Sequence, residues 1–120
     1  MTRADEAEEA VCQEVLGILA LVGDKWSLLV VAQLRDGPVR FGELHRAVRG
    51  ISQRMLTLTL RKLERDGLVS RSVHASVPPR VDYALTALGE SLLGPALALG
   101  GWAAEHRPEI AANRRRYDAR

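Results

Sequence analysis

The spacing of the apolar residues changes at Gly67, and this change limits the folds open to the chain. Before Gly67 the apolar residues recur at helical intervals, whereas residues 68–74 and 80–85 show the alternation typical of strands. The two predicted strands are joined by residues 75–79, which include two prolines and predict a tight turn. The sequence therefore predicts an α+β, mainly α-helical fold in which several helices precede a single β-hairpin.

Helix start and stop signals divide the rest of the chain. The predicted helices cover about residues 11–22, 25–34, 41–48, 53–66 and 87–106. Asp24, Ser52 and Thr86 stand at the expected N-caps, where a side-chain oxygen accepts a hydrogen bond from the first helical turn. The last helix is expected to bend or restart at Gly94-Pro95, because proline cannot donate the helical hydrogen bond.

The 120 residues are the size of one domain. We expect a flexible acidic N-terminus at residues 1–10, a folded domain at residues 11–106 and a basic, disordered tail at residues 107–120. No apolar run has the length of a membrane span, and the first residues lack the apolar region of a signal peptide. Together with a single cysteine, these features favour a cytoplasmic protein that does not contact a membrane.

Charge is unevenly distributed along the chain. Residues 1–14 hold one arginine against five carboxylates, a net charge of −4, whereas residues 49–80 hold seven arginines and lysines against two carboxylates, a net charge of +5. A basic central third favours a polyanionic partner. Charge alone does not decide, because arginine outnumbers lysine fifteen to two, and genome composition can produce that bias.

The predicted helix at residues 53–66 separates two kinds of side chain. At 100° per residue, Leu56, Leu60 and Leu63 lie on one side, while the opposite side holds Arg54, Thr57, Leu58, Arg61 and Arg65. This helix follows another across a short turn at residues 49–51, where Gly50 tolerates a positive φ. Two such helices followed by a hairpin form a winged helix–turn–helix.

Such an outward face suits the major groove of double-stranded DNA. The residues expected to touch the groove are Arg54, Thr57, Leu58 and Arg61, and those expected to hold the phosphate backbone or flank are Ser52, Gln53, Arg65 and Arg80. Arginine forks match guanine edges or phosphates, and a methyl-bearing side chain can contact thymine. The alternatives are an ordinary solvated surface, or a winged helix used for contact with another protein.

Several linked motifs resemble those of the HxlR-type regulators, winged-helix relatives of the MarR-like repressors. The similar stretches are residues 23–29, 36–44, 50–57, 63–69 and 78–86, within a region of about residues 12–105. The resemblance implies a cytoplasmic homodimer, built from the first and last helices, that binds an inverted-repeat operator. The output expected from the family is repression.

The first and last helices carry more apolar residues than one small core requires. The residues expected at the dimer interface are Val15, Leu19, Leu92, Leu99, Trp102 and Ala103. The alternatives are that both helices cover the core of a single monomer, or that Trp102 lines a pocket for a small ligand.

Cys12 is the candidate redox sensor, because some members of the family sense oxidants or electrophiles through a cysteine in the first helix. It departs from the family pattern by one residue, and the neighbouring carboxylates of Glu8, Glu9 and Glu14 disfavour the reactive thiolate. The alternative is an inert cysteine. Histidines and carboxylates show no spacing typical of a metal centre or an active site, so we expect neither a cofactor nor catalysis.

Overall fold

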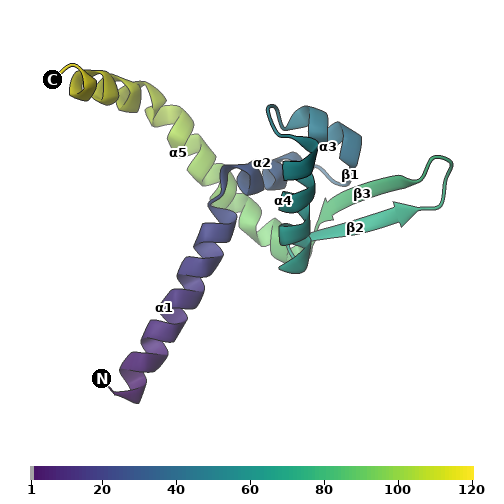
Figure 1. Cartoon of the computed structure of the whole chain (residues 1–120), viewed down its shortest axis with the longest axis horizontal. Coiled ribbons are helices and arrows are strands. Elements are labelled where there is room, and N and C mark those ends of the chain that lie inside the picture. The colour runs from purple at the N-terminus through teal and green to yellow at the C-terminus, as the bar shows by residue number, and fades with distance from the viewer. Residues whose placement is uncertain (1) are drawn as a thin grey trace.

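The computed structural model describes residues 2–120 and arranges them as helices around a small antiparallel sheet (Figure 1). The elements are α1 (Arg3–Val22), α2 (Lys25–Gln33), β1 (Val39–Arg40), α3 (Phe41–Ala47), α4 (Gln53–Arg65), β2 (Val69–His74), β3 (Arg80–Leu85) and α5 (Ala87–Asp118). Their order confirms the predicted winged helix–turn–helix, with the hairpin β2–β3 as the wing.

One apolar core joins α2, α3 and α4 to the base of the wing. Its most buried members are Val30, Val31, Leu34, Leu44, Leu56, Leu60, Leu63 and Val69. With so few aromatic residues in the chain, branched aliphatic side chains fill this core. The core fixes the position of α4 relative to the wing.

The turn between α3 and α4 depends on backbone geometry and capping. Gly50 has a φ of 87°. This confirms the positive φ expected at the turn, which a residue with a Cβ rarely adopts. The Ser52 hydroxyl accepts a hydrogen bond from the Met55 amide at 3.0 Å and so caps α4. The His45 ring lies 3.0 Å from the Ile51 carbonyl oxygen and ties α3 to the same turn. Both helices therefore meet at a fixed angle.

The sheet has the strand order β1-β3-β2, with β3 antiparallel to both neighbours. Tyr83 of β3 pairs with Val39 on one side and Arg71 on the other, and its side chain is buried against the core. Beyond this contact the hairpin projects from the body (Figure 1).

The start of α5 is fastened to the base of the wing through Thr86. Its hydroxyl donates to the Gly67 carbonyl and accepts from the Gly89 amide, as an N-cap does. Gly89 lies against the Leu68 backbone so closely that a Cβ there would stand 2.0 Å from the Leu68 carbonyl oxygen. Close packing at this junction holds α5 against the domain.

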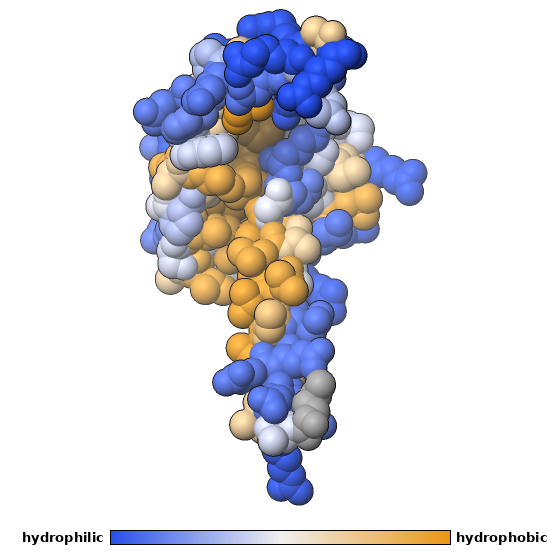
Figure 2. Space-filling view, turned by 90° about the vertical axis from the view of Figure 1, so that its left-hand side faces the viewer, coloured by the Kyte–Doolittle hydropathy of each residue, from blue (hydrophilic) through white to orange (hydrophobic). Residues whose placement is uncertain are grey.

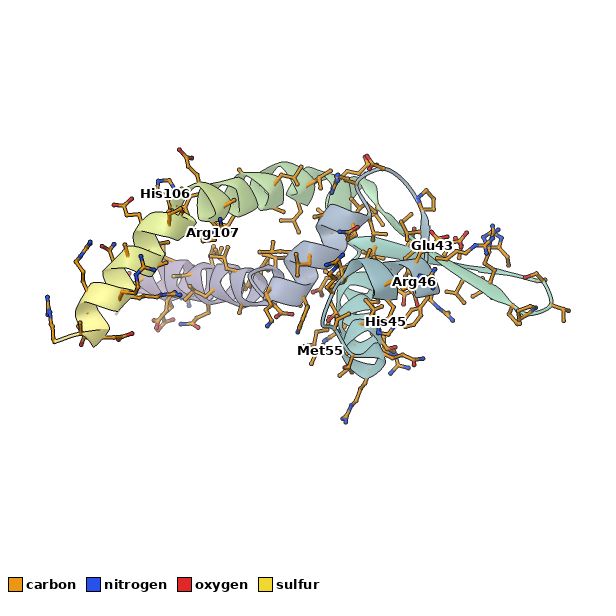
Figure 3. All side chains as sticks on the ribbon, turned by 90° about the horizontal axis from the view of Figure 1, so that it is seen from above. Glu43, His45, Arg46, Met55, His106 and Arg107 are labelled. Carbon is orange, nitrogen blue, oxygen red and sulfur yellow. The ribbon has the colours of Figure 1, made fainter. Side chains whose placement is uncertain are left out.

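Both chain ends correct the expectation from sequence. The segment expected to be flexible at residues 1–10 is helical from Arg3, because Thr2 and Asp5 form a reciprocal capping box. The tail expected to be disordered at residues 107–120 is helical to Asp118. Alanines and arginines there favour helix, and α5 bends near His106 and Arg107, close to Pro108 (Figure 3), rather than stopping.

The molecule is more extended than its length requires. Its radius of gyration is 18.2 Å, whereas a compact chain of this length has about 14 Å. The difference arises because α1 and the second half of α5 project from the core in diverging directions (Figure 1). No residue of α1 is buried.

Candidate nucleic-acid interface

Helix α4 presents the two faces that the sequence predicts. Leu56, Leu60 and Leu63 are buried, and Thr59 is buried with them. Met55 lies at the margin (Figure 3), with 37% of its surface exposed. The opposite face turns toward solvent, so the core packing leaves it free for a partner.

Guanidinium groups dominate the exposed face of α4. Arg54, Arg61 and Arg65 are exposed, and within residues 2–120 none of them forms a salt bridge with a carboxylate. Leu58 lies among them and is 38% exposed. Their positive charge is therefore unneutralised by the protein itself, as a surface that binds phosphate requires.

A shallow groove runs along this face. Its walls are Gln53, Arg54, Thr57, Leu58 and Arg61, five of the eight residues that the sequence predicts at the DNA interface. The Thr57 hydroxyl donates to the Gln53 carbonyl at 2.9 Å, so its acceptor lone pairs and its methyl group remain for contact. Ser52 accepts a bond in its cap, and its own hydroxyl proton therefore remains available to a phosphate.

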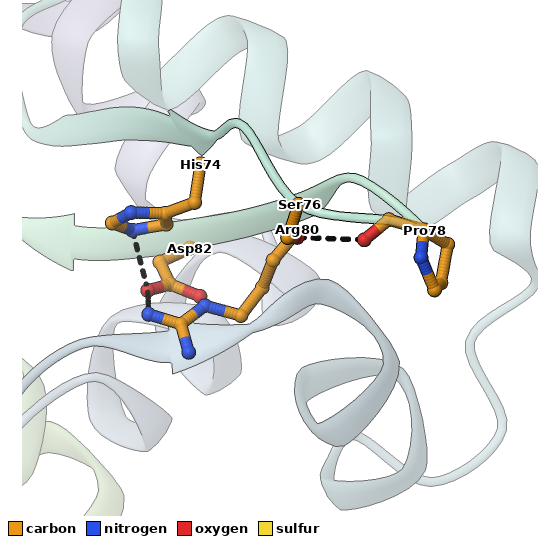
Figure 4. A network of polar contacts seen from close by, with 5 residues as sticks. All are labelled: His74, Ser76, Pro78, Arg80 and Asp82. Atoms are coloured by element: carbon orange, nitrogen blue, oxygen red, sulfur yellow. Dashed lines mark hydrogen bonds and ion pairs between the residues drawn. The ribbon is translucent and has the colours of Figure 1, made fainter.

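Arg80 lies at the start of β3 and is held by its own strand (Figure 4). Its Nη2 lies 3.3 Å from Asp82 Oδ2, and the ring of His74 lies 3.0 Å from the same oxygen. Beside this network the Ser76 hydroxyl donates to the Pro78 carbonyl at 2.7 Å and closes the turn. Arg80 is thus pre-positioned on the wing, unlike the free arginines of α4.

Two basic residues that are not among those predicted at the DNA interface, Arg71 and Arg40, lie beside predicted ones. Arg71 of β2 lines a hollow together with Thr57 and Arg61 of α4. It also borders a second hollow under the wing, together with Arg40 and Arg80. Arg71 contributes to the basic third of the sequence, but its place beside α4 depends on the packing of the wing.

The residues predicted at a dimer interface lie along α1 and α5. Val15, Leu19, Leu99 and Trp102 are each about half exposed, while Leu92 also packs against the core. An apolar cleft of about 900 Å³ separates the two helices, with Leu19 and Leu92 among its walls. Ala103 is exposed on α5, and Cys12 is a free, exposed cysteine on α1.

Within residues 2–120, no group of three metal-ligating side chains comes together. No single described helix is long and apolar enough to span a membrane. By length and composition, α1 and α2 reach that limit only when taken as a pair across a bend of 66°.

The fold and the basic helix define a winged helix–turn–helix DNA-binding domain. The family model described as HxlR-like helix-turn-helix matches residues 21–111. The chain belongs to this family and is a transcriptional regulator.

Related sequences are described as HTH-type transcriptional regulators. A protein of Methanothermobacter thermautotrophicus, described as an uncharacterized HTH-type transcriptional regulator, is 49% identical over 68% of this chain and 62% of its own length. The chain thus spans less than two thirds of that relative. The uncharacterized HTH-type transcriptional regulator YtfH of Escherichia coli is 39% identical over 90% of this chain and 83% of its own.

Solved structures agree with the fold. The putative transcriptional regulator YtfH from Salmonella typhimurium superposes with a TM-score of 0.79 at 38% identity, covering 84% of this chain and 90% of that one. The redox regulator HypR in its reduced form gives a TM-score of 0.76 at 39% identity, covering 82% and 98%. Diamide-treated YodB from Bacillus subtilis gives 0.66 at 34% identity, covering 77% and 91%.

Proposed function

We propose that this protein is a cytoplasmic repressor that binds an inverted-repeat operator as a homodimer. The observation that carries the proposal is the exposed face of α4, whose arginines have no carboxylate partner in residues 2–120. In this proposal Arg54, Thr57, Leu58 and Arg61 contact the major groove. Ser52, Gln53 and Arg65 hold the phosphates, and Arg80 reaches the flanking groove from the wing.

The homodimer is supported by the exposed apolar surface of α1 and α5. Figure 2 views the side from which these helices project and shows apolar residues gathered between two hydrophilic ends. In the single chain, about half of the surface of each of four apolar side chains is exposed to solvent: Val15, Leu19, Leu99 and Trp102. A patch of this kind on an extended molecule favours association, because burial of apolar surface is the main driving force for it.

Fluorescence anisotropy with the DNA that flanks the gene tests DNA binding. We expect Arg54→Ala and Arg61→Ala each to weaken binding by about 1–3 kcal/mol, about 5- to 150-fold. Lys25→Ala, a cation on another helix, is the matched control and leaves the affinity close to that of the wild type. Equal affinity in all four proteins would remove α4 from the interface.

The competing function is contact with another protein through the same winged helix, with the basic face unused. It predicts no binding to flanking DNA even at low salt. DNA binding that falls steeply with added salt supports our proposal instead, because each neutralised phosphate releases counterions. Repression further predicts that deletion of the gene raises transcription of a neighbouring gene.

A second function, oxidant sensing through Cys12, is favoured by two observations. Cys12 is exposed on α1, next to the surface assigned to the dimer, and HypR and YodB are structural neighbours, the first named a redox regulator. Oxidation at this position would then alter how the two DNA-binding helices are spaced. DNA affinity before and after diamide should change in the wild type and not in Cys12→Ser; an equal response in both removes Cys12 from the mechanism.

A further inference from the structure

The exposed apolar surface of α1 and α5 ends in opposite charges. Residues 2–9 hold one arginine against four carboxylates, a net charge of −3, and residues 107–120 hold five arginines against two carboxylates, a net charge of +3. We call these segments the acidic end of α1 and the basic end of α5. Both lie at the tips of helices that project from the core (Figure 1).

The two ends lie at opposite margins of one apolar surface. In Figure 2 the end of α5 forms the hydrophilic upper margin, and the start of α1 forms the lower one. The two helices diverge, so that within one chain the acidic end does not meet the basic end (Figure 1). Salt bridges within residues 2–120 involve neither end.

Two copies related by a two-fold axis can bring together the acidic and basic ends that do not meet within one chain. An axis that lies in the plane of the interface and is perpendicular to the line joining the two margins exchanges them, so the basic end of one copy comes over the acidic end of the other. The same operation repeats the contact at the other margin. Association about this axis therefore brings unlike charges together twice, whereas a two-fold axis along the line joining the margins would bring like charges together. Charge complementarity favours the first axis.

Helical spacing identifies the side chains that face the second copy. Glu8 precedes Val11 by three residues and Val15 by seven, so it continues the exposed apolar stripe of α1. Glu6 lies on the opposite side of that helix. Asp5 is engaged in the Thr2 capping box, which leaves Glu8 as the carboxylate aligned with the stripe.

The basic end has a corresponding residue. Arg114 follows Ile110 by four residues and precedes Tyr117 by three, so it shares their side of α5. Tyr117 is 69% exposed, and Arg114 is exposed beside it. Arg115 points to a different side, because each residue adds 100° around the helix axis.

We propose that Glu8 binds Arg114 of the partner subunit, and that this pair, formed twice, closes the two margins of the dimer interface. The proposal rests on the homodimer proposed above and adds its register and its dependence on salt. The occupant is a second copy of this chain, since that copy supplies both an apolar surface and the opposite charge at each margin.

Charge-reversal variants of the full chain test the pair. Their dimer Kd is measured by analytical ultracentrifugation at 0.1 M NaCl. Glu8→Arg and Arg114→Glu should each raise the dimer Kd about tenfold, because two exposed attractions become repulsions. The double variant, which restores unlike charges, should return to within about threefold of the wild type. The differences should shrink in 1 M NaCl, where charges are screened within about 3 Å.

Matched controls reverse the same charges on the other sides of the helices. Glu6→Arg and Arg115→Glu should leave the dimer Kd within about threefold of the wild type. Single reversals without effect, or a double variant weaker than either single one, overturn the pair while leaving the dimer intact. A wild type that stays monomeric contradicts the homodimer itself. Weakened DNA binding by Arg114→Glu at an unchanged dimer Kd assigns the basic end to DNA and also overturns the pair.

Discussion

Asp82 and Arg80 form an ion pair on one face of β3, with 3.3 Å between Asp82 Oδ2 and Arg80 Nη2. The Asp82 side chain is only 16% exposed, so the arginine is held by a carboxylate that is largely shielded from water. The arginines of α4 have no such anchor. The wing and α4 therefore present positive charge in different ways, one fixed in place and the other free to adapt to its partner.

Removal of the anchor should weaken DNA binding through Arg80. We expect Asp82→Asn to lower the affinity about three- to tenfold, because a mobile arginine loses more freedom on binding. Arg80→Ala should lower it at least as much, and the double variant should resemble Arg80→Ala alone. Anisotropy titrations of the three variants measure this. Additive losses would show that Asp82 acts independently of Arg80.

Neighbouring leucines on α4 should separate stability from binding. Leu60 is 1% exposed, and Leu60→Ala should lower the free energy of unfolding by about 2–5 kcal/mol. Leu58 is 38% exposed. Leu58→Ala should therefore lower the free energy of unfolding much less than Leu60→Ala, but it should weaken DNA binding. Urea unfolding and DNA titration of both variants give the two quantities. A large loss of stability in Leu58→Ala would contradict its place at the interface.

The junction between α5 and the wing should not tolerate a side chain at Gly89. A Cβ there would approach the Leu68 carbonyl oxygen to 2.0 Å, so the start of α5 must shift. We expect Gly89→Ala to lower the free energy of unfolding by about 1–3 kcal/mol. Gly100→Ala, on the same helix with open space around it, should be neutral or slightly stabilising. Thermal unfolding by circular dichroism compares the two.

The first turn of α1 should depend on pH through Asp5. Hydrogen bonds from the Thr2 side chain, and then from its backbone amide, lower the pKa of Asp5 in the folded helix. A lowered pKa means that the cap is fully formed above the ordinary carboxyl range and is lost as the pH falls through the folded value. An NMR titration of Asp5 should show this pKa rising toward its ordinary value in Thr2→Ala. No change would remove the side chain of Thr2 from the cap.

Local signals explain why much of the fold was predictable from sequence. Gly50 and Ser52 mark the turn and cap before α4, and the spacing of Leu56, Leu60 and Leu63 defines its buried side. These features depend on neighbours within a few residues. The alternation in β3 is equally local, and its observed limits, Arg80–Leu85, match the prediction.

The features that the sequence did not predict depend on contacts between distant segments, or on whether helix-forming residues outweigh a proline. The predicted end of the last helix at about residue 106 is wrong, because the helix-forming residues after Pro108 continue α5 to Asp118. The place of Arg71 depends on the wing packing beside α4, two segments that only the folded core brings together. The orientation of Arg80 likewise depends on Asp82 and on His74 from the neighbouring strand.

Hydroxyl-radical footprinting of the flanking DNA tests the central claim most directly, because it reports where two α4 helices contact one duplex. We predict two protected regions related by two-fold symmetry, with centres one helical turn or a multiple of it apart, about 34 Å for one turn. Arg54→Ala and Arg61→Ala should weaken the protection of both regions together. A single asymmetric protected region, or protection unchanged in both variants, would contradict the account.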